Sequence, residues 1–388
     1  MKKIILLFIF CTFIINNQAF SIEDVSGDVL IKYNFDNLTK SDYKYVDKGG
    51  RLNGGLYIYS KQDMNLIENL YLKSTLLFKT FGRRVYNGAY GKHSAITNNS
   101  RLNDDFYGKE NYLKRKIYFD HYGLALEEIA FEYKEDAFLF GLGKFNPKFG
   151  IAYDESKLTG NYSTLLAKKY EMKEKIGGYL GINSENFKLI FNTFYDDNSF
   201  LSDTLFYNRG RNKGKNGVGN TRKFNNFSIF SEAVFSDYKI NLGFRRLATT
   251  NSQERSEKGY VFGIQKYFEE TEYSVGANPL FEIAYLDNYN GNKYRNLATT
   301  TFRLPIFYKG WQFIASHSYQ YDNEKHAKDY MGYVSELSLG YKFKNGLLIS
   351  AGKNWVKDIN KTVDNTAKEK ETYKYRSYNI NLSYIYEY

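Results

Sequence analysis

The chain has 388 residues, a formal net charge of +11 and a mean hydropathy of −0.55, although 43% of its residues are hydrophobic and 18% are aromatic. Beyond the N-terminal segment, no run approaches the ~20 consecutive apolar residues that a membrane-spanning helix needs, which excludes an α-helical membrane protein. The single cysteine excludes a disulfide framework, and no recognisable nucleic-acid-binding module accompanies the basic charge.

Residues 1–21 have the features of a secretory signal peptide. Lys2 and Lys3 precede an apolar run of signal-peptide length, and small residues then stand where a signal peptidase reads the chain. Cys11 lies inside the apolar run and not at its end, so we expect it to be discarded and not lipid-modified. Residues 22–388 are predicted to form one exported domain with a net charge of +9, because the two lysines leave with the signal peptide.

The rest of the chain is built from segments in which apolar or aromatic residues alternate with polar ones. A period of two indicates a β-strand with one apolar and one wet face. Each segment is about as long as the 9–11 residues with which a tilted strand crosses a bilayer. The clearest segments are 29–35, 56–59, 70–78, 129–133, 187–195, 238–244, 260–268, 311–321, 337–343 and 376–388.

The connections between these segments alternate between short and long. Short turns are predicted at 134–136, 184–186, 236–237, 308–310 and 345–346. Long loops are predicted at 146–174, 196–224, 248–258, 288–296, 322–332 and 357–372. Bacterial membrane barrels show this asymmetry, whereas a soluble β-sandwich has no reason to show it. We therefore predict an all-β fold, a transmembrane antiparallel β-barrel of about 16 strands, with 14 or 18 as alternatives.

The last segment, 376–388, reads RSYNINLSYIYEY and ends on the aromatic Tyr388. It resembles the C-terminal signal strand of bacterial outer-membrane β-barrels, which the barrel-insertion machinery reads. The resemblance implies a location in the bacterial outer membrane, contact with its lipid and lipopolysaccharide, and a role for Tyr388 as insertion signal.

One motif resembles the segment that leads into the inward-folded loop of porins of the phosphate-selective O and P type. Its residues are Gly143, Lys144, Phe145, Asn146, Pro147, Lys148, Phe149 and Gly150. The proline stands one position earlier than in that family's pattern. The resemblance implies that loop 146–174 folds into the barrel; the alternative is an ordinary outer loop. Strict alternation turns Lys144 outward, and it reaches the lumen only if Gly141 or Gly143 hosts a β-bulge.

Strand alternation also predicts which charged side chains face the lumen. The basic candidates are Lys188, Lys239, Arg245, Arg303 and Lys342, and the acidic ones are Glu128, Glu132 and Glu336. Opposed charges would set a transverse field that orients solutes and biases ion selectivity. The alternative is charge that only keeps the lumen wet, and a register slip of one residue would invert any assignment.

No catalytic or cofactor motif is recognisable. Ser316-His317-Ser318 is similar to the Ser and His that an outer-membrane phospholipase uses on its lipid face, but no third member can be identified. There is neither a Gly-rich phosphate cradle nor a Cys/His cluster for zinc, so we expect no enzyme, cofactor or metal site.

We predict a porin that passes small hydrophilic solutes by passive diffusion, with an anion preference suggested by the net charge. The basic loop 196–224 would attract anionic solutes or contact lipopolysaccharide phosphates. The resemblance to porins implies a homotrimer. We expect no nucleic-acid partner, because no module that reads nucleic acid is recognisable. The alternatives are a structural or adhesive barrel with a blocked lumen, and a secreted soluble all-β protein.

Overall fold

The computed structural model describes residues 25–41, 51–80, 122–154, 166–207, 209–212, 217–250, 254–324, 328–362 and 370–387. The predicted signal peptide, residues 1–21, and the predicted insertion signal, Tyr388, lie outside the described residues.

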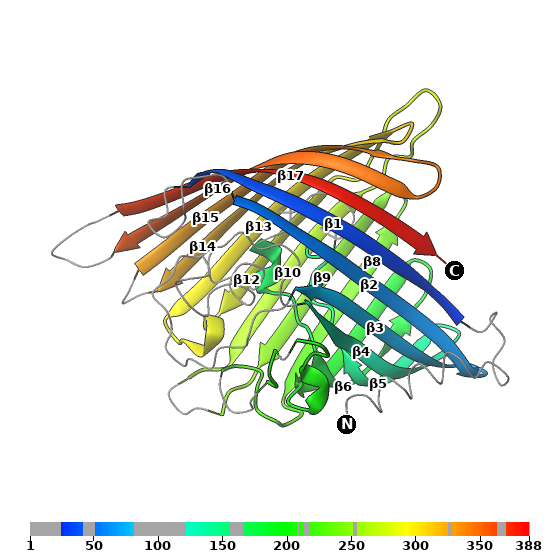
Figure 1. Cartoon of the computed structure of the whole chain (residues 1–388). Coiled ribbons are helices and arrows are strands. Elements are labelled where there is room, and N and C mark those ends of the chain that lie inside the picture. Colours follow the sequence, from blue (N-terminus) through cyan, green and yellow to red (C-terminus); the bar gives the residue numbers. More distant parts are fainter. Residues whose placement is uncertain are drawn as a thin grey trace.

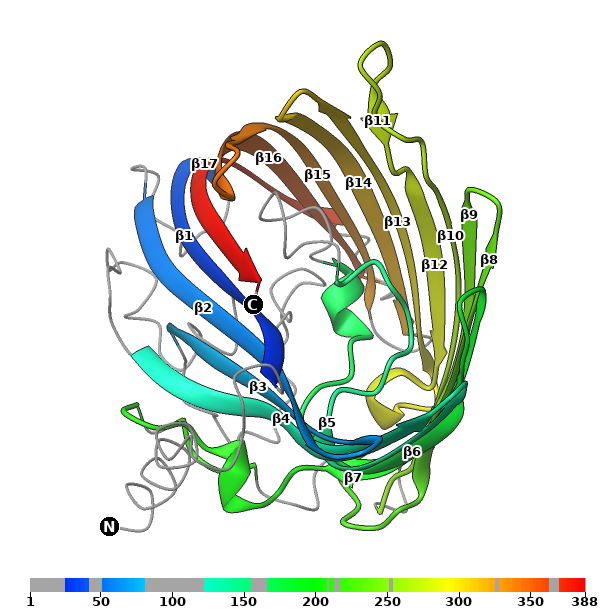
Figure 2. The same ribbon diagram turned by 90° about the vertical axis from the view of Figure 1, so that its right-hand side faces the viewer.

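The described residues form one antiparallel sheet that closes into a barrel (Figures 1 and 2). The first half comprises β1 (Val25–Ser41), β2 (Arg51–Ile67), β3 (Leu70–Thr80), β4 (Tyr122–Glu135), β5 (Phe138–Phe145), β6 (Lys175–Asn183), β7 (Phe187–Asp196) and β8 (Asn226–Phe235). The second half comprises β9 (Tyr238–Leu247), β10 (Glu257–Lys266), β11 (Gly276–Ala277), β12 (Leu280–Asp287), β13 (Arg295–Tyr308), β14 (Trp311–Glu324), β15 (Lys328–Lys342), β16 (Leu347–Thr362) and β17 (Lys370–Glu387).

The barrel is closed by hydrogen bonding between the first and last strands, β1 and β17. The two-residue β11 pairs with β13, as β12 does, and Ala277 also bridges to Phe268 just beyond β10. β11 and β12 are therefore two parts of one interrupted strand. The barrel has 16 strands, which confirms the predicted fold class.

Short turns gather at one end of the barrel, on the right in Figure 1 with the end of β17. Asn69, Asp136, Ser236 and Lys309 have positive φ in these turns, as tight hairpins whose twist matches the strands require. The connection 267–275 is longer than the others at this end and was not anticipated. The long connections 146–174, 197–225, 248–256 and 288–294 leave the sheet at the other end, where β5, β7, β9 and β12 finish.

Two predicted loops proved to be largely strand. The predicted loops 322–332 and 357–372 shrink to 325–327 and 363–369, because β14 to β17 continue further than expected. The extensions are polar, for example Asp322 and Asn323. Beyond the bilayer both faces of a barrel wall meet water, so the apolar alternation that marks a strand in the sequence disappears there.

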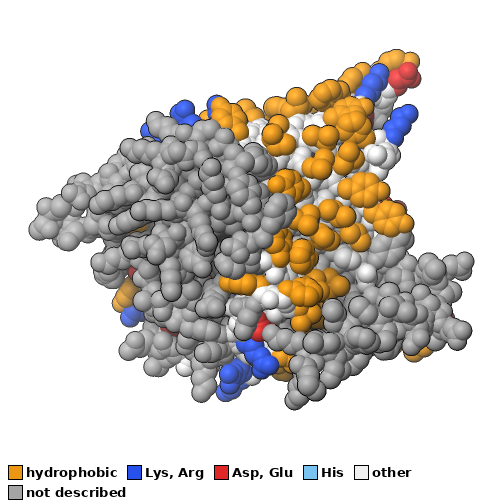
Figure 3. All heavy atoms as spheres, viewed as in Figure 1, with side chains coloured by type: hydrophobic (Ala, Val, Ile, Leu, Met, Phe, Trp, Pro, Cys, Tyr) orange, Lys and Arg blue, Asp and Glu red, His pale blue; other side chains and the backbone are white. Residues whose placement is uncertain are grey.

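Polar and apolar side chains are distributed opposite to the pattern of a soluble protein. Large apolar residues such as Phe140, Leu337 and Leu382 are exposed on the outer face, where Figure 3 shows apolar side chains gathered over the strands. Asn379 and Asn381, which alternate with the outward-facing residues of β17, are buried inside. An apolar outer band around a polar interior is the arrangement of a transmembrane barrel. Among the described residues, no helix combines the length and apolar character needed to span a bilayer.

After Phe145 the chain leaves the wall and enters the barrel. The described residues 146–154 and 166–174, here called the inward segment, include the 3-10 turn η4 (Leu166–Lys169). In Figure 2, η4 lies within the ring of strands, and it contacts β13 and β14 on the far wall. Phe149 and Tyr170 are fully buried in a cluster with wall residues of β7 to β13. The predicted inward-folded loop is therefore confirmed.

Glycines in the wall make room for this segment. A Cβ at Gly243 would lie 2.1 Å from the backbone oxygen of Phe149, and one at Gly259 would lie 2.9 Å from the Phe149 ring. Both distances are below van der Waals contact, so the close approach of the inward segment requires glycine at these positions.

The departure of the chain into the lumen leaves part of β4 without β5 beside it. Another segment covers that edge: Leu124 and Leu205 exchange backbone hydrogen bonds of 3.1 and 2.9 Å. Leu205 belongs to residues 197–207 and 209–212, here called the outer cover, which include the 3-10 turn η5 (Phe200–Ser202). Covering an exposed strand edge prevents pairing with another chain.

Candidate functional site

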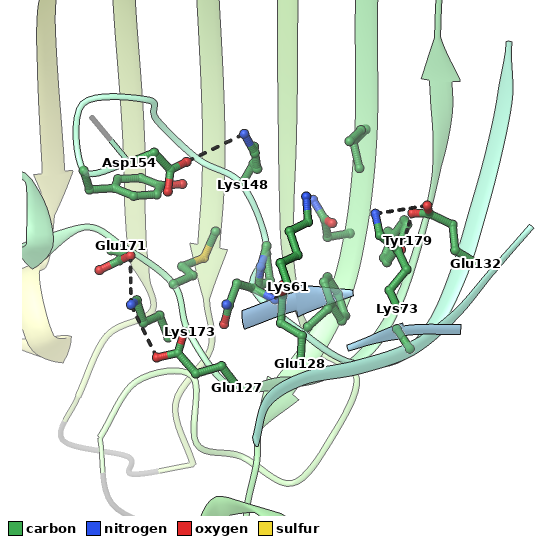
Figure 4. Close-up of a pocket in the computed structure, with 18 of the residues that line it drawn as sticks. Lys61, Lys73, Glu127, Glu128, Glu132, Lys148, Asp154, Glu171, Lys173 and Tyr179 are labelled. Carbon is green, nitrogen blue, oxygen red and sulfur yellow. Dashed lines mark hydrogen bonds and ion pairs between the residues drawn. The ribbon is translucent and has the colours of Figure 1, made fainter. Parts of the chain in front are cut away.

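A charged cavity of about 470 Å³ lies in the lumen between the inward segment and the wall (Figure 4). Its charged lining residues are five lysines and six carboxylates. They are Lys61, Lys73, Lys148, Lys173, Lys188, Asp28, Glu127, Glu128, Glu132, Asp154 and Glu171. In Figure 4 the charges of the inward segment stand on one side, where Glu127 of β4 meets Lys173, and Lys73 and Glu132 stand on the other. A solute that crosses the barrel here would pass between two charged surfaces.

Glu132 is the centre of the charge cluster on the wall side. Its carboxylate lies 3.1 Å from Lys73 Nζ and 3.0 Å from Lys134 Nζ, and it accepts a hydrogen bond of 2.6 Å from the Tyr179 hydroxyl. Lys73 belongs to β3, Glu132 and Lys134 to β4, and Tyr179 to β6. Three donors on one buried carboxylate hold this part of the lining in a fixed geometry.

A β-bulge places a second pair of carboxylates in the cavity. The register between β3 and β4 shifts where Thr75 pairs with Glu128 and Leu76 with Leu126, so Glu127 has no partner on β3. Both Glu127 and Glu128 consequently line the cavity, whereas strict alternation would send one of them outward. Sequence reasoning missed Glu127 for this reason.

These two glutamates join the wall to the inward segment. Glu128 accepts hydrogen bonds from the Thr75 hydroxyl (2.7 Å) and from the backbone N–H of Asn146 (2.9 Å), where the inward segment begins. Glu127 lies 3.6 Å from the Nζ of Lys173, which is near the end of the inward segment. The two ends of the inward segment are therefore attached to the same bulge of β4.

The inward segment also carries ion pairs of its own. Lys148 lies 3.7 Å from Asp154, and Glu171 lies between Lys168 at 3.2 Å and Lys173 at 3.3 Å. Two of these cations, Lys148 and Lys173, and both carboxylates line the cavity, so the face that the segment presents there is charged but close to neutral overall.

On the far wall, Glu282 of β12 holds the middle of the inward segment. It accepts hydrogen bonds from the backbone N–H groups of Ile151 (2.7 Å) and Ala152 (3.1 Å) and from the Tyr170 hydroxyl (2.5 Å). Burial, followed by the nearby negative charge of Glu282, raises the pKa of Tyr170 well above its ordinary value. Tyr170 therefore remains a neutral donor. Glu282 was not predicted, because the alternation of its strand was not delimited in the sequence.

Arg245 of β9 completes this attachment. It donates to the backbone oxygen of Tyr170 at 2.7 Å and to Glu257 at 2.6 Å, and its guanidinium lies 4.8 Å from the centre of the Phe149 ring. Arg245 was predicted as a selectivity residue. The structure places it beneath the inward segment, where it contacts the backbone and Glu257.

The other predicted lumen residues do not form one cluster. Lys188, Glu128 and Glu132 line the cavity, and Arg303 and Glu336 are buried on β13 and β15. Lys239 lies near the short-turn end, 3.8 Å from Glu232 and above the Tyr267 ring. Lys342 is exposed at that end and does not line the cavity. The alternation of side chains along a strand separates inward-facing from outward-facing residues. It does not show how far along the barrel axis a residue lies.

The motif that predicted the inward segment divides between several environments. Phe145 and Pro147 line the cavity, Phe149 is buried against the wall, and Gly150 faces Glu282 so closely that a Cβ would lie 2.8 Å from the carboxylate. Gly143 has a φ of 146°, and the β4–β5 register continues there without a shift.

Lys144, in contrast, does not line the cavity. Its ammonium group lies 2.9 Å from Asp197 and 3.7 Å from Glu174, and it donates to the backbone oxygen of Leu201 at 2.8 Å. Arg209 of the outer cover binds both carboxylate oxygens of Glu174. Lys144 therefore joins the ends of the inward segment to the outer cover.

Solved structures of similar architecture are outer-membrane proteins. An anion-selective porin from Comamonas acidovorans matches with a TM-score of 0.52 and 10% identity over 93% of this chain and 99% of that chain. OmpT, an outer-membrane protein of Vibrio cholerae, matches as a loop L8 deletion mutant (TM-score 0.51, 11% identity, 94% and 100% of the chains). Its trimer form, folded in vitro, matches with a TM-score of 0.50 (10% identity, 93% and 99%).

The fold of this chain is that of an outer-membrane β-barrel. At 10–11% identity the likeness extends to the fold alone. No protein-family model matches the chain, and no curated protein sequence is significantly similar to it. Within the described ranges, no group of three or more His, Cys, Asp or Glu side chains is placed to hold a metal ion.

Proposed function

We propose that this barrel is an outer-membrane porin, a water-filled channel for the passive diffusion of small hydrophilic solutes. The observation that carries the proposal is the charged cavity, which forms where the inward segment narrows the lumen. We further propose that residues 1–21 are removed on export, that residues 22–388 form the whole barrel domain, and that the barrel has no enzymatic activity. The trimer form of OmpT supports a homotrimer.

The mechanism is movement down a concentration gradient, filtered by width and charge. A solute in the cavity meets Lys148 and Lys173 of the inward segment and the carboxylates of β4. In a low-dielectric wall such opposed charges act over several ångströms and orient a dipolar solute as it passes. Hydrogen bonds from the inward segment to Glu128 on one wall and to Glu282 on the other fix its position in the lumen.

The proposed anion preference comes from the net charge of the chain and not from the cavity alone. Five lysines and six carboxylates nearly cancel in the cavity, so its contribution to ion selectivity is small. Exposed basic residues of the long-loop end, Arg211, Arg222 and Lys223, raise the local concentration of anions at the mouth. We expect a weak preference that falls as the ionic strength rises.

Planar-bilayer conductance of the refolded protein tests the proposal. Stepwise openings are expected, and in a salt gradient the reversal potential should indicate weak anion selectivity. Lys188→Gln, in the cavity, should shift the reversal potential toward cations. Lys342→Gln removes the same charge outside the cavity and should leave the reversal potential almost unchanged.

A folded protein without conductance would contradict the proposed porin function. Folding is checked independently by the heat-modifiable mobility of the barrel on a gel. Silent but folded protein would indicate the alternative, a structural or adhesive barrel with a blocked lumen. Equal shifts in Lys188→Gln and Lys342→Gln would show that the cavity does not control ion passage.

A further inference from the structure

Four basic residues lie together on the outer face of β16 and β17. They are Lys353, Lys357, Lys374 and Arg376, here called the outer basic patch. Their direction follows from burial: Asn354, Val356 and Ser377, which alternate with them, are at most 2% exposed. Lys357, Lys374 and Arg376 are exposed, and Lys353 is half-buried. The patch therefore shares the outer face with the apolar residues that surround the barrel.

The strand register concentrates these charges. Lys357 pairs directly with Lys374, and in the next outward-facing row Trp355 pairs with Arg376. Lys353 stands opposite Tyr378 in the row after that. Like charges directly opposite one another on a sheet are destabilising. An anion bound between Lys357 and Lys374 would offset this repulsion.

The patch lies at the level where the apolar band gives way to polar surroundings. Tyr319, Tyr333, Trp355 and Tyr378 form one aromatic row, and Trp311, Tyr341 and Phe343 form another toward the short turns. Tyr333 and Tyr341 are eight residues apart on β15, about 20 Å along the barrel axis for a tilted strand. Aromatic rows at such a separation mark the two membrane interfaces. The outer basic patch is at the interface nearer the long loops.

The lysines of the patch rest on aromatic rings. Lys353 Nζ lies 5.2 Å from the centre of the Trp355 ring and 5.1 Å from that of Tyr378. Lys357 Nζ lies 5.8 Å from the centre of the Tyr333 ring. On the same face of β15, the carboxylate of Asp329 accepts a hydrogen bond of 3.2 Å from the Tyr321 hydroxyl. Among the side chains that the structure describes on this part of the outer face, the four cations of the patch outnumber the carboxylate of Asp329, which leaves an excess of positive charge.

We propose that the outer basic patch binds the phosphate groups of lipopolysaccharide in the outer leaflet. Long loops of bacterial barrels face the cell exterior, so this interface meets the leaflet that carries phosphorylated lipid. Lysine and arginine form charge-assisted hydrogen bonds with phosphate, while the rings of Trp355 and Tyr378 lie against the upper acyl chains. The site is on the lipid face and does not depend on whether the lumen conducts.

The two tryptophans of the chain allow a direct test. Trp355 pairs with Arg376 of the patch, and Trp311 lies in the opposite aromatic row, so each single-tryptophan variant reports on one interface. Lipid A with both phosphates is titrated into refolded Trp311→Phe protein in an uncharged detergent. We expect a saturable change in Trp355 fluorescence. Trp355→Phe protein, which retains Trp311, should show none.

Charge variants then connect binding to the patch. Lys353→Gln/Lys357→Gln should bind about thirtyfold more weakly, because each lysine near an anionic lipid surface contributes roughly a fivefold factor. Lys353→Arg/Lys357→Arg should retain binding. Lys258→Gln is the matched control, since Lys258 is an exposed lysine near the long-loop end of β10. Gel mobility confirms that each variant is folded.

Several outcomes would overturn the proposal. Equal affinity in the double glutamine variant, or an equal loss in Lys258→Gln, would show that the patch is not the site. Equal binding of dephosphorylated lipid A would exclude the phosphates as ligands. Equal binding of phosphatidylglycerol would indicate an unspecific anionic surface. A fluorescence change that follows protein concentration without lipid would indicate a second copy of the chain as the occupant.

Discussion

Glu282 holds the inward segment through three donors, two of them backbone N–H groups that no rearrangement of side chains can replace. The carboxylate is fully buried, so these hydrogen bonds replace the water that it lost on folding. Their contribution to stability is larger when the carboxylate is charged and falls when the charge is removed. A residue on β12 thus holds the middle of a segment that begins after β5.

We expect Glu282→Gln to loosen the inward segment. The amide retains one acceptor oxygen, but its NH₂ group faces N–H donors, so at least one of the three hydrogen bonds is lost. Hydrogen bonds to charged groups contribute about 1.5–3 kcal/mol each, so we expect a loss of about 2–4 kcal/mol in the free energy of unfolding. Urea titration of the refolded barrel measures this loss, and channel recordings should show noisier and larger openings.

Glu232→Gln provides the comparison, because Glu232 of β8 lies near Lys239 at the short-turn end. That variant should retain both the stability and the conductance of the parent protein. If Glu282→Gln behaved as Glu232→Gln does, the inward segment would be held by its apolar contacts alone.

At the scale of elements, the close contact between the inward segment and β9 depends on Gly243. Gly243→Ala would place a methyl group 2.1 Å from the Phe149 backbone oxygen, and backbone atoms cannot avoid it by a rotamer change. We expect a destabilisation of about 1–3 kcal/mol, as for overpacking, and a shift of the inward segment that widens the lumen. Single-channel conductance should rise.

Gly178→Ala on β6 is the matched control. Its Cβ would lie 2.7 Å from a terminal methyl group of Leu142, which can rotate away, and its nearest backbone atom, the oxygen of Gly141, is 3.1 Å away. This variant should conduct like the parent protein. An unchanged conductance in Gly243→Ala would mean that the inward segment does not limit the channel width.

The sequence predicted elements well where a local pattern determines them. The turns predicted at 134–136, 184–186 and 236–237 lie at or beside tight hairpins of the structure, and the motif around Phe149 indicated the inward segment. The bulge at Glu127 could not be predicted, because its position depends on the pairing of β4 with β3 and not on β4 alone. Glu282 could not be identified as an attachment point for a similar reason. Its partners are far away in the sequence: Ala152 is separated from it by 130 residues and Tyr170 by 112.

The whole molecule is organised by the contrast between its outer and inner faces. Leu337, midway between Tyr333 and Tyr341 on β15, faces outward in the apolar band and is 45% exposed. Met331 faces the same side beyond Tyr333, toward the long loops. The same substitution at these two sites compares two depths in the bilayer without changing the strand.

Leu337→Arg should destabilise the barrel in lipid bilayers by about 2–4 kcal/mol, because a cation near the bilayer midplane is poorly solvated. Met331→Arg should cost at most about 1 kcal/mol, since its guanidinium reaches the headgroups. Urea unfolding in lipid vesicles measures both values, and the difference should shrink in detergent, whose thin apolar layer is easily penetrated by water. Similar values at the two positions in bilayers would place the membrane at a different level on the barrel. The outer basic patch would then no longer lie at a headgroup interface, so this comparison also tests the membrane position on which that site depends.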